Sequence, residues 1–278
     1  MLRYCGLAAT LMLLATVSLA AQAELRLETV IERASHFVLQ QRDALGNVRA
    51  DEDYTQELQL AGGSVLQSRH LESEMAFVRL SQSEEWLAFR NVMRIDGVPT
   101  GTDTARLEQL FREGAISRQG RRIAEESAIH NIGNLQRTLN VPTIVTHLLM
   151  PGQQTRFRFR KRSESHTPER SWLVSFDERD RPTIVRTKAG RDVPLKGELA
   201  IAVDDGHLLR ATLEATVPVR SELEFSWRHD AGLNAWVPAQ MRERYRDVRE
   251  TKTRLTYDII GVATYSNYRR FGVDVRIK

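Results

Sequence analysis

Hydrophobic and polar positions change their spacing along the chain, and each spacing predicts a different kind of element. Residues 24–41 carry apolar side chains at intervals of three and four, which is the pattern of one amphipathic helix. The polar segment 43–53 that follows contains Gly46 and is typical of a loop. Alternating apolar and polar positions then predict three strands, and Asp96-Gly97 predicts the turn that ends them. These strands are expected at 54–60, 73–80 and 86–95.

A helical spacing returns between residues 102 and 140, where apolar side chains again recur every three or four positions. Gly114 and Gly120 are expected to divide this segment. Pro142 is expected to end it, because the residue before a proline avoids helical geometry. The apolar run 143–150 fits either a strand or a short buried helix, and we favour the helix. The sequence thus predicts a central helical insert at about 102–150.

Strands and turns fill most of the chain after Pro151-Gly152. Asp204-Asp205-Gly206 predicts a tight hairpin turn, and consecutive hairpins of this kind form an antiparallel meander. Strands do not alternate with helices through glycine-rich turns, so we do not expect a parallel nucleotide-binding sheet. The expected strands are 155–162, 171–177, 183–187, 196–203, 207–217, 221–229, 236–247 and 251–266.

One face of this meander is apolar and the other is polar. Leu223, Phe225 and Trp227 share one side of their strand, whereas Glu222 and Glu224 share the opposite side. A long meander curls because strands twist, and its apolar concave face then needs a cover. The helix at 24–41 and the central insert are the available covers. The predicted fold class is therefore α+β, predominantly antiparallel β.

The first residues have the pattern of a cleavable secretory signal peptide. Arg3 gives a positive start, residues 6–21 are almost wholly apolar, and Ala21-Gln22-Ala23 places small residues where a signal peptidase reads them. A retained membrane anchor is the alternative, but a spanning helix needs about 20 apolar residues. Cleavage after Ala23 removes residues 1–23 together with Cys5, the only cysteine. We expect residues 24–278 to form a single exported domain, periplasmic or secreted and not integral to a membrane.

Charge and motifs argue against several functions. After cleavage, 39 Lys and Arg face 36 Asp and Glu, and the basic residues are scattered, so we expect no nucleic-acid partner. Neither G-x-S-x-G nor H-E-x-x-H occurs, so we expect no enzyme, no cofactor and no metal site. Glu126 and His130 stand four positions apart on one helix face, which we interpret as a surface pair.

Residues 156–162 alternate arginine with phenylalanine and then become fully basic. Arg156, Arg158 and Arg160 would share one face of a strand, where guanidinium groups suit anionic headgroups, phosphate or an acidic partner. The alternative is a solvated strand face with both phenylalanines turned inward. Nearby acidic residues would then neutralise the arginines, namely Glu164, Glu178 and Asp180.

Two segments of the second half resemble the outer-membrane lipoprotein carriers and their relatives. The first is GELAIAVDDGHLLRATLEA at 197–215, and the second is NAWVPAQMRERY at 234–245. In that superfamily a strand, a D-x-G turn and a return strand precede a strand that is entered through a proline. Two further segments are similar to uncharacterised exported bacterial proteins, RRIAEESAIHNIG at 121–133 and GVATYSNYRRF at 261–271.

The resemblance implies a curved, incomplete β-barrel, a meander covered by the N-terminal helix and the central insert. It also implies an apolar cavity for a lipid, an acyl chain or a lipidated partner protein. The candidates for its lining are Trp172, Val174, Phe176, Phe225 and Trp227. Aromatic residues on the dry face of a strand are also ordinary core, so an alternative stays open. In that alternative the core is filled, and the protein is an exported scaffold or sensor that binds an envelope protein.

Overall fold

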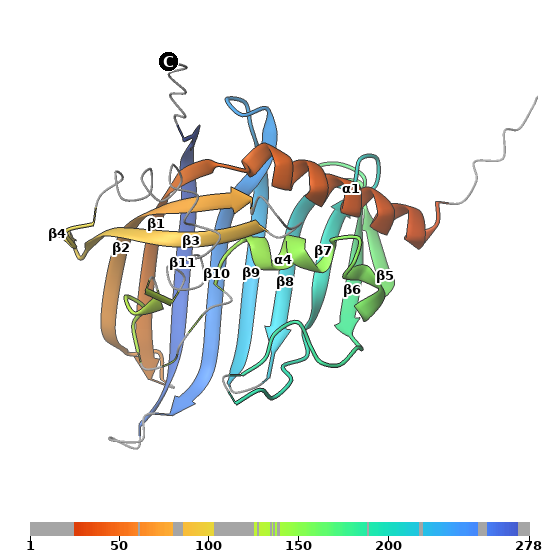
Figure 1. Ribbon diagram of the computed structural model, residues 1–278. Helices are drawn as coiled ribbons and strands as arrows, with labels where there is room; N and C mark the ends of the chain where they lie inside the picture. The colour runs from red at the N-terminus through yellow and green to blue at the C-terminus, as the bar shows by residue number, and fades with distance from the viewer. Residues whose placement is uncertain are drawn as a thin grey trace, which may run out of the picture.

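The computed structural model describes residues 25–60, 62–79, 86–102, 125–126, 128–133, 135, 137, 140–187, 189–216, 219–249 and 255–271. The predicted signal peptide and most of the predicted insert at 102–140 lie outside these residues. The described part is an α+β fold with one large, curved antiparallel sheet and one long N-terminal helix (Figure 1).

The sheet has eleven strands, of which the first four belong to the N-terminal part of the chain. These four are β1 (Val48–Leu60), β2 (Val65–Arg79), β3 (Trp86–Ile95) and β4 (Val98–Pro99). The other seven are β5 (Phe157–Ser165), β6 (Ser171–Glu178), β7 (Lys196–Ala202), β8 (Leu208–Ala215), β9 (Arg220–Asp230), β10 (Ala235–Arg249) and β11 (Thr256–Arg270).

The strand order is β4-β3-β2-β1-β11-β10-β9-β8-β7-β6-β5, and every pairing is antiparallel. Two meanders are therefore joined where the first strand of one pairs with the last strand of the other. The two ends of this order, β4 and β5, do not pair with each other, so the sheet curves without closing. The predicted fold class, an incomplete antiparallel barrel, is confirmed.

Helices cover the concave side of the sheet. Helix α1 (Leu27–Leu45) crosses its upper end, and the short helix α4 (Thr143–Leu148) lies in front of its middle strands (Figure 1). Val30, Ala34 and Val38 on α1 are fully buried at the three-and-four spacing expected of an amphipathic helix. They join Val145 of α4 and the inward-facing side chains of the sheet in one large apolar cluster, called the main cluster below.

Sequence patterns placed most elements correctly but placed the start of two strands too late. The segment 43–53 was expected to be a loop, yet β1 begins at Val48. The many charged residues of this segment were interpreted as a loop. In the structure they belong to the outer face of the strand, since Arg49, Asp51 and Asp53 face outward while Val48 and Ala50 face the core. Strand β2 likewise begins at Val65, ahead of the expected residue 73. The preference for a helix within 143–150 is confirmed by α4.

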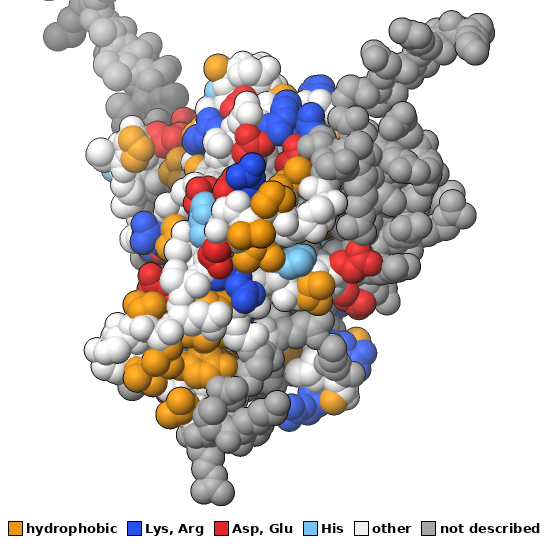
Figure 2. Space-filling view, turned by 90° about the vertical axis from the view of Figure 1, so that its left-hand side faces the viewer, with side chains coloured by type: hydrophobic (Ala, Val, Ile, Leu, Met, Phe, Trp, Pro, Cys, Tyr) orange, Lys and Arg blue, Asp and Glu red, His pale blue; other side chains and the backbone are white. Residues whose placement is uncertain are grey.

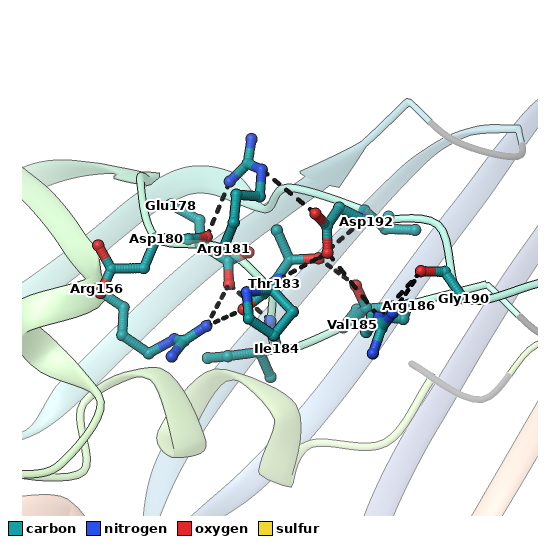
Figure 3. A network of polar contacts seen from close by, with 12 residues as sticks. Arg156, Glu178, Asp180, Arg181, Thr183, Ile184, Val185, Arg186, Gly190 and Asp192 are labelled. Atoms are coloured by element: carbon teal, nitrogen blue, oxygen red, sulfur yellow. Dashed lines mark hydrogen bonds and ion pairs between the residues drawn. The ribbon is translucent and has the colours of Figure 1, made fainter.

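The expected strand at 183–187 does not form. This segment belongs to a loop between β6 and β7 in which one isolated bridge joins Arg186 to Asp192. Side chains hold the loop (Figure 3). The Glu178 carboxylate accepts from the Ile184 amide at 2.7 Å, and Asp192 accepts from the Thr183 amide at 2.9 Å. Carboxylates here replace the ladder partners that a strand would require.

The molecule also exposes some apolar side chains at the β2–β4 end of the sheet. Figure 2 shows this side, where apolar side chains gather in small patches among acidic, basic and histidine side chains. The exposed large apolar residues at this end are Val65, Leu66, Val98 and Ile129. Some exposed apolar residues are ordinary on a protein surface, so the concave face is the more informative apolar surface.

Candidate functional site

The five residues predicted to line a cavity all lie on the concave side of the sheet. Trp172, Val174 and Phe176 come from β6, and Phe225 and Trp227 come from β9. Each is at most 6% exposed, and all five belong to the main cluster. The alternation of the strands therefore brings these residues together as predicted. Whether they contact a ligand stays a prediction.

Three indole N–H groups in the main cluster are buried without a hydrogen-bond acceptor among the described residues. They belong to Trp86 on β3, Trp172 on β6 and Trp227 on β9. Cross-strand register places Trp172 opposite Ile201, and Trp227 opposite Pro238. A buried indole N–H usually finds a partner, because leaving it unpaired costs about 1–3 kcal/mol. The apolar interior thus contains three donors able to bond an oxygen acceptor.

Helix α1 rests on the β7–β8 hairpin and on the start of β10. The Arg33 guanidinium donates to the Val203 carbonyl, and Gln41 Nε2 donates to the Trp236 carbonyl at 3.0 Å. Gly206 in the hairpin turn makes this approach possible. A Cβ built there would lie 2.2 Å from the carbonyl carbon of Arg33. Asp204-Asp205-Gly206 is the tight turn that the sequence predicted.

His207 follows that turn and lies beneath α1. Its ring stacks on Trp236 with centroids 3.9 Å apart, and its edge meets Phe37 of α1. Nδ1 lies 2.6 Å from an Asp205 carboxylate oxygen, and Nε2 lies 3.2 Å from a Glu169 oxygen. These contacts hold the turn, the histidine and the helix together, so His207 has a positioning role under α1.

A buried polar belt crosses the concave face below the main cluster. It comprises Glu52, Tyr54 and Gln56 on β1, Arg90 on β3, Glu243 on β10, and Arg137 and Asn140 from the segment before α4. Glu52, Tyr54 and Gln56 are alternate residues of one strand, so all three side chains face inward. The belt separates the main cluster from a second apolar cluster, formed by Ile132, Tyr245, Val248, Tyr257 and Ile259.

Two ion pairs organise the belt. The Arg90 guanidinium donates twice to Glu52, with the longer bond at 2.7 Å, and Arg137 pairs with Glu243. Both charges of each pair are at most 2% exposed, and the two arginines balance the two carboxylates. Burying charges is costly, but paired and hydrogen-bonded charges can persist where they specify one arrangement.

The belt bonds three residues that precede α4 in the chain, Ile132, Arg137 and Asn140, to inward-facing side chains of the sheet. Arg137 donates to Gln56 and to the Ile132 carbonyl at 3.1 Å, and Gln56 Oε1 accepts from the Ile132 amide at 3.1 Å. Arg90 donates to the Asn140 carbonyl at 3.3 Å. Ile132, Arg137 and Asn140 are therefore each bonded to a charged or amide side chain of the sheet.

Tyr54 and Glu243 meet where β11 carries a glycine. The Tyr54 hydroxyl donates to Glu243, and a Cβ on Gly261 would lie 2.8 Å from Glu243 Cγ and 2.9 Å from Tyr54 Cε2. Burial, followed by the Glu243 charge, raises the pKa of Tyr54, so the phenol stays protonated as a donor. The same causes raise the pKa of Tyr245, whose hydroxyl also bonds Glu243, at 3.1 Å.

Sequence reasoning missed this belt. Its signal was present, since two hydrophilic residues, Glu52 and Gln56, flank Tyr54 at the alternate positions that an inward strand face uses. The assignment of 43–53 to a loop concealed the pattern. The pairing of Arg137 with Glu243 joins residues 106 positions apart, and a contact over that separation cannot be predicted from local spacing.

The three arginines proposed for anionic groups are not on one strand face. Arg156 lies in a 3-10 turn, η1 (Gln154–Arg156), before β5, where it donates to the Pro182 carbonyl and lies 4.0 Å from Glu178. Arg158 and Arg160 are on β5, each 3.7 Å from Asp177 of β6. The inference of one shared face is therefore wrong for Arg156, since the chain is not yet extended there.

Strand β5 is an edge of the sheet, which gives its basic residues a structural role. An edge strand presents unpaired backbone groups, and charged side chains discourage another chain from pairing with them. Lys161 and Arg170 bond the Glu164 carboxylate at 2.8 and 2.9 Å and hold its pKa down to about 2. Binding of an anion by Arg156, Arg158 or Arg160 stays a prediction.

Metal binding gains no support from the described part of the chain, where no group of three or more His, Asp, Glu or Cys side chains converges. Within the same residues, no helix is long and apolar enough to cross a membrane.

Arg69 Nη1 donates to the His130 backbone carbonyl at 2.9 Å. Burial and this cation lower the pKa of His130.

No protein-family model and no curated protein matches the chain. Among solved structures, a DUF1329 family protein from Desulfovibrio piger is similar over 90% of this chain and 94% of its own length, at 11% identity and a TM-score of 0.37. A LolA superfamily protein from Nitrosomonas europaea is similar over 91% and 97%, at 6% identity and a TM-score of 0.35. At these identities and TM-scores neither structure carries an argument about function, which must be inferred from this chain's own residues.

Proposed function

We propose that the protein is an exported, non-enzymatic binding protein that holds an acyl chain, a lipid or a lipidated protein against its concave apolar face. One observation carries this proposal: the main cluster spans an unclosed sheet, and its covers are helices that are not part of that sheet. A cover of this kind can shift without breaking strand pairing. The sheet would then supply a preformed apolar surface for the ligand.

The unpaired indole N–H groups support a ligand with oxygen acceptors. Lipids carry ester, carboxyl or phosphate oxygens beside their apolar chains. An acceptor of this kind reaching Trp172 or Trp227 would remove the cost of a buried unpaired donor while its chain stays in apolar surroundings. One lipid molecule could thus bury its acyl chain in the main cluster and accept a hydrogen bond from an indole N–H there.

A second candidate is an exported scaffold or sensor with a filled core. It is favoured by the burial of all five predicted lining residues, each at most 6% exposed beneath the cover. In this candidate the helices are permanent parts of the core, and partners bind outside it. The two candidates differ in one measurable property, which is whether an acyl chain ever contacts the tryptophans of the main cluster.

Quenching by brominated fatty acid tests the proposal, because bromine quenches tryptophan fluorescence only near contact. The chain has four tryptophans, Trp86, Trp172, Trp227 and Trp236. Titration of lipid-free mature protein should quench part of the emission saturably. The Trp172→Phe and Trp227→Phe variants should each remove a portion of the quenchable emission.

Trp236→Phe is the matched control, since Trp236 stacks on His207 under α1 and is only partly buried beside the main cluster. It should leave the quenchable portion largely intact. A titration in which brominated and unbrominated fatty acids have the same effect on emission would contradict the proposal and favour the filled core.

A further inference from the structure

A pocket is lined by the start of β9 and the end of β10. These strand ends lie at the lower edge of the sheet in Figure 1, opposite the end that α1 crosses. The volume of the pocket is about 560 Å³, within the range of about 300–1,000 Å³ typical of ligand sites. Three arginines from the adjoining ends of β9 and β10 line it, namely Arg220, Arg246 and Arg249. The pocket lies outside the main cluster.

A bulge in β10 shapes this pocket. Tyr245 pairs with Ile259 and Val248 pairs with Tyr257, so β10 has one residue more than β11 between the two pairs. Asp247 in the bulge has a φ of 54°, a conformation that non-glycine residues seldom adopt. Bulges redirect side chains and are frequent beside functional sites. Here the bulge lets Val248 face inward while Arg246 stays at the mouth of the pocket.

Two of the arginines lie directly opposite each other. Arg220 of β9 pairs with Arg246 of β10 across the ladder, an arrangement that is unfavourable unless something offsets the repulsion. Glu222 lies between them, 3.3 Å from Arg220 Nε and 2.9 Å from Arg246 Nη2, and the hydrogen bond from Arg246 lowers the pKa of this carboxyl. One carboxylate is thus shared by two guanidinium groups.

Donors remain at the pocket after this pairing. Arg246 Nε is buried and has no acceptor among the described residues. The side chain of Arg249 is exposed, and it makes no ion pair or hydrogen bond with another described residue. Asp247 is the acidic residue in the lining, and even with Glu222 beside it the three arginines outnumber these two carboxylates. The surplus of guanidinium groups suits a phosphate or carboxylate.

The other side of the pocket is apolar. Leu135, Val219 and Val248 line it, and all three pack in the second apolar cluster with Ile259 and Tyr257. A basic mouth beside an apolar wall fits a ligand with an anionic head and a hydrocarbon tail. We propose that this pocket binds the phosphate or carboxylate head of an anionic amphiphile, at a site separate from the main cluster.

Isothermal titration of the mature protein with short-chain lipids tests this inference. Dihexanoyl phosphatidic acid should bind, whereas dihexanoyl phosphatidylcholine, with the same tails and no net charge, should bind at least tenfold more weakly. The double variant Arg220→Gln/Arg249→Gln should lower affinity for the anionic lipid at least tenfold. Arg244→Gln is the matched control, since Arg244 is on β10 but bonds Asp258 at 2.7 Å and does not line the pocket.

Inorganic phosphate separates the two sources of the anionic group. Phosphate should bind more weakly than the anionic lipid, because it makes no use of the apolar wall. Equal affinity for phosphate and lipid would overturn the amphiphile, and unchanged lipid binding by the double variant would overturn the site. The double variant should still show bromine quenching of Trp172 and Trp227, so failure here is distinguishable from failure of the proposed function.

Discussion

At the scale of single residues, the most informative positions are charged side chains that face inward. Glu52 and Glu243 stand where β1 and β10 would be expected to carry apolar residues, and each is paired with a buried arginine. Replacing such pairs by apolar residues is often tolerated, whereas removing one partner leaves a buried charge alone. The belt therefore specifies how the segment before α4 docks, more than it adds net stability.

The Glu243→Gln substitution tests this interpretation. It keeps the shape of the side chain but leaves the Arg137 charge buried without its counterion, so the free energy of unfolding should fall by about 3–5 kcal/mol. Urea denaturation followed by far-UV circular dichroism measures the change.

Glu224→Gln is the matched control on the outer face of the neighbouring strand. Glu224 pairs with Arg210 at 3.0 Å, but both side chains are more than a third exposed. Its substitution should change the free energy of unfolding by no more than about 0.5 kcal/mol. Equal losses from the two variants would show that the belt is not the buried network described here.

At the scale of elements, the position of α1 on the sheet depends on the turn at Gly206, where the backbone of the turn approaches the backbone of α1 closely. Gly206 has a φ of 81°, and its missing side chain makes room for the backbone of Arg33 and Ala34. Gly97, between β3 and β4, has a nearly equal φ of 79° but nothing within 4 Å of a built Cβ. The two glycines share a positive-φ backbone conformation, which glycine adopts without strain, and they differ in the contact with α1.

Gly206→Ala should therefore displace α1, while Gly97→Ala should not. Both variants incur the cost of an alanine at positive φ, on the order of 1 kcal/mol. Gly206→Ala alone adds a clash with backbone atoms, so it should lower the melting temperature further and increase binding of the dye ANS by exposing the main cluster. Equal behaviour of the two variants would contradict the close seating of α1.

The same scale shows what the sequence could predict. Clear alternation and turn residues located β6 through β11 and the amphipathic α1 to within a few residues. Segment 183–187 has strand-like residues but no ladder partners beyond one bridge, because carboxylates of Glu178 and Asp192 bond its amides instead. Segment 48–53 has charged residues on its outer side, and only its pairing with β2 and β11 identifies it as strand.

The lining of the candidate site was predictable from strand alternation, whereas its long-range contacts were not. The period of two along β6 and β9 places Trp172, Val174, Phe176, Phe225 and Trp227 on one side of the sheet, whatever its partners are. Contacts between distant segments were not predictable. The Arg220–Arg246 pair depends on the register of β9 with β10, and the Arg137–Glu243 pair depends on how the segment before α4 is placed.

At the scale of the whole molecule, the open sheet and its helical cover pose one question, which is whether the interior ever accommodates a ligand. The main cluster extends across the sheet from β3 to β5 and includes side chains of α1 and α4. Because the sheet does not close, a cover could shift by breaking its own contacts with the sheet and no strand pairing. The proposed function rests on this property and on the unpaired indole groups beneath the cover.

Mass spectrometry of the exported protein tests this account most directly. Protein purified without detergent after export should be analysed both intact under native conditions and after solvent extraction. We predict a bound acyl lipid at about one molecule per protein, lost after delipidation and restored by added fatty acid. Absence of bound lipid, together with no uptake of fatty acid by the delipidated protein, would contradict the account.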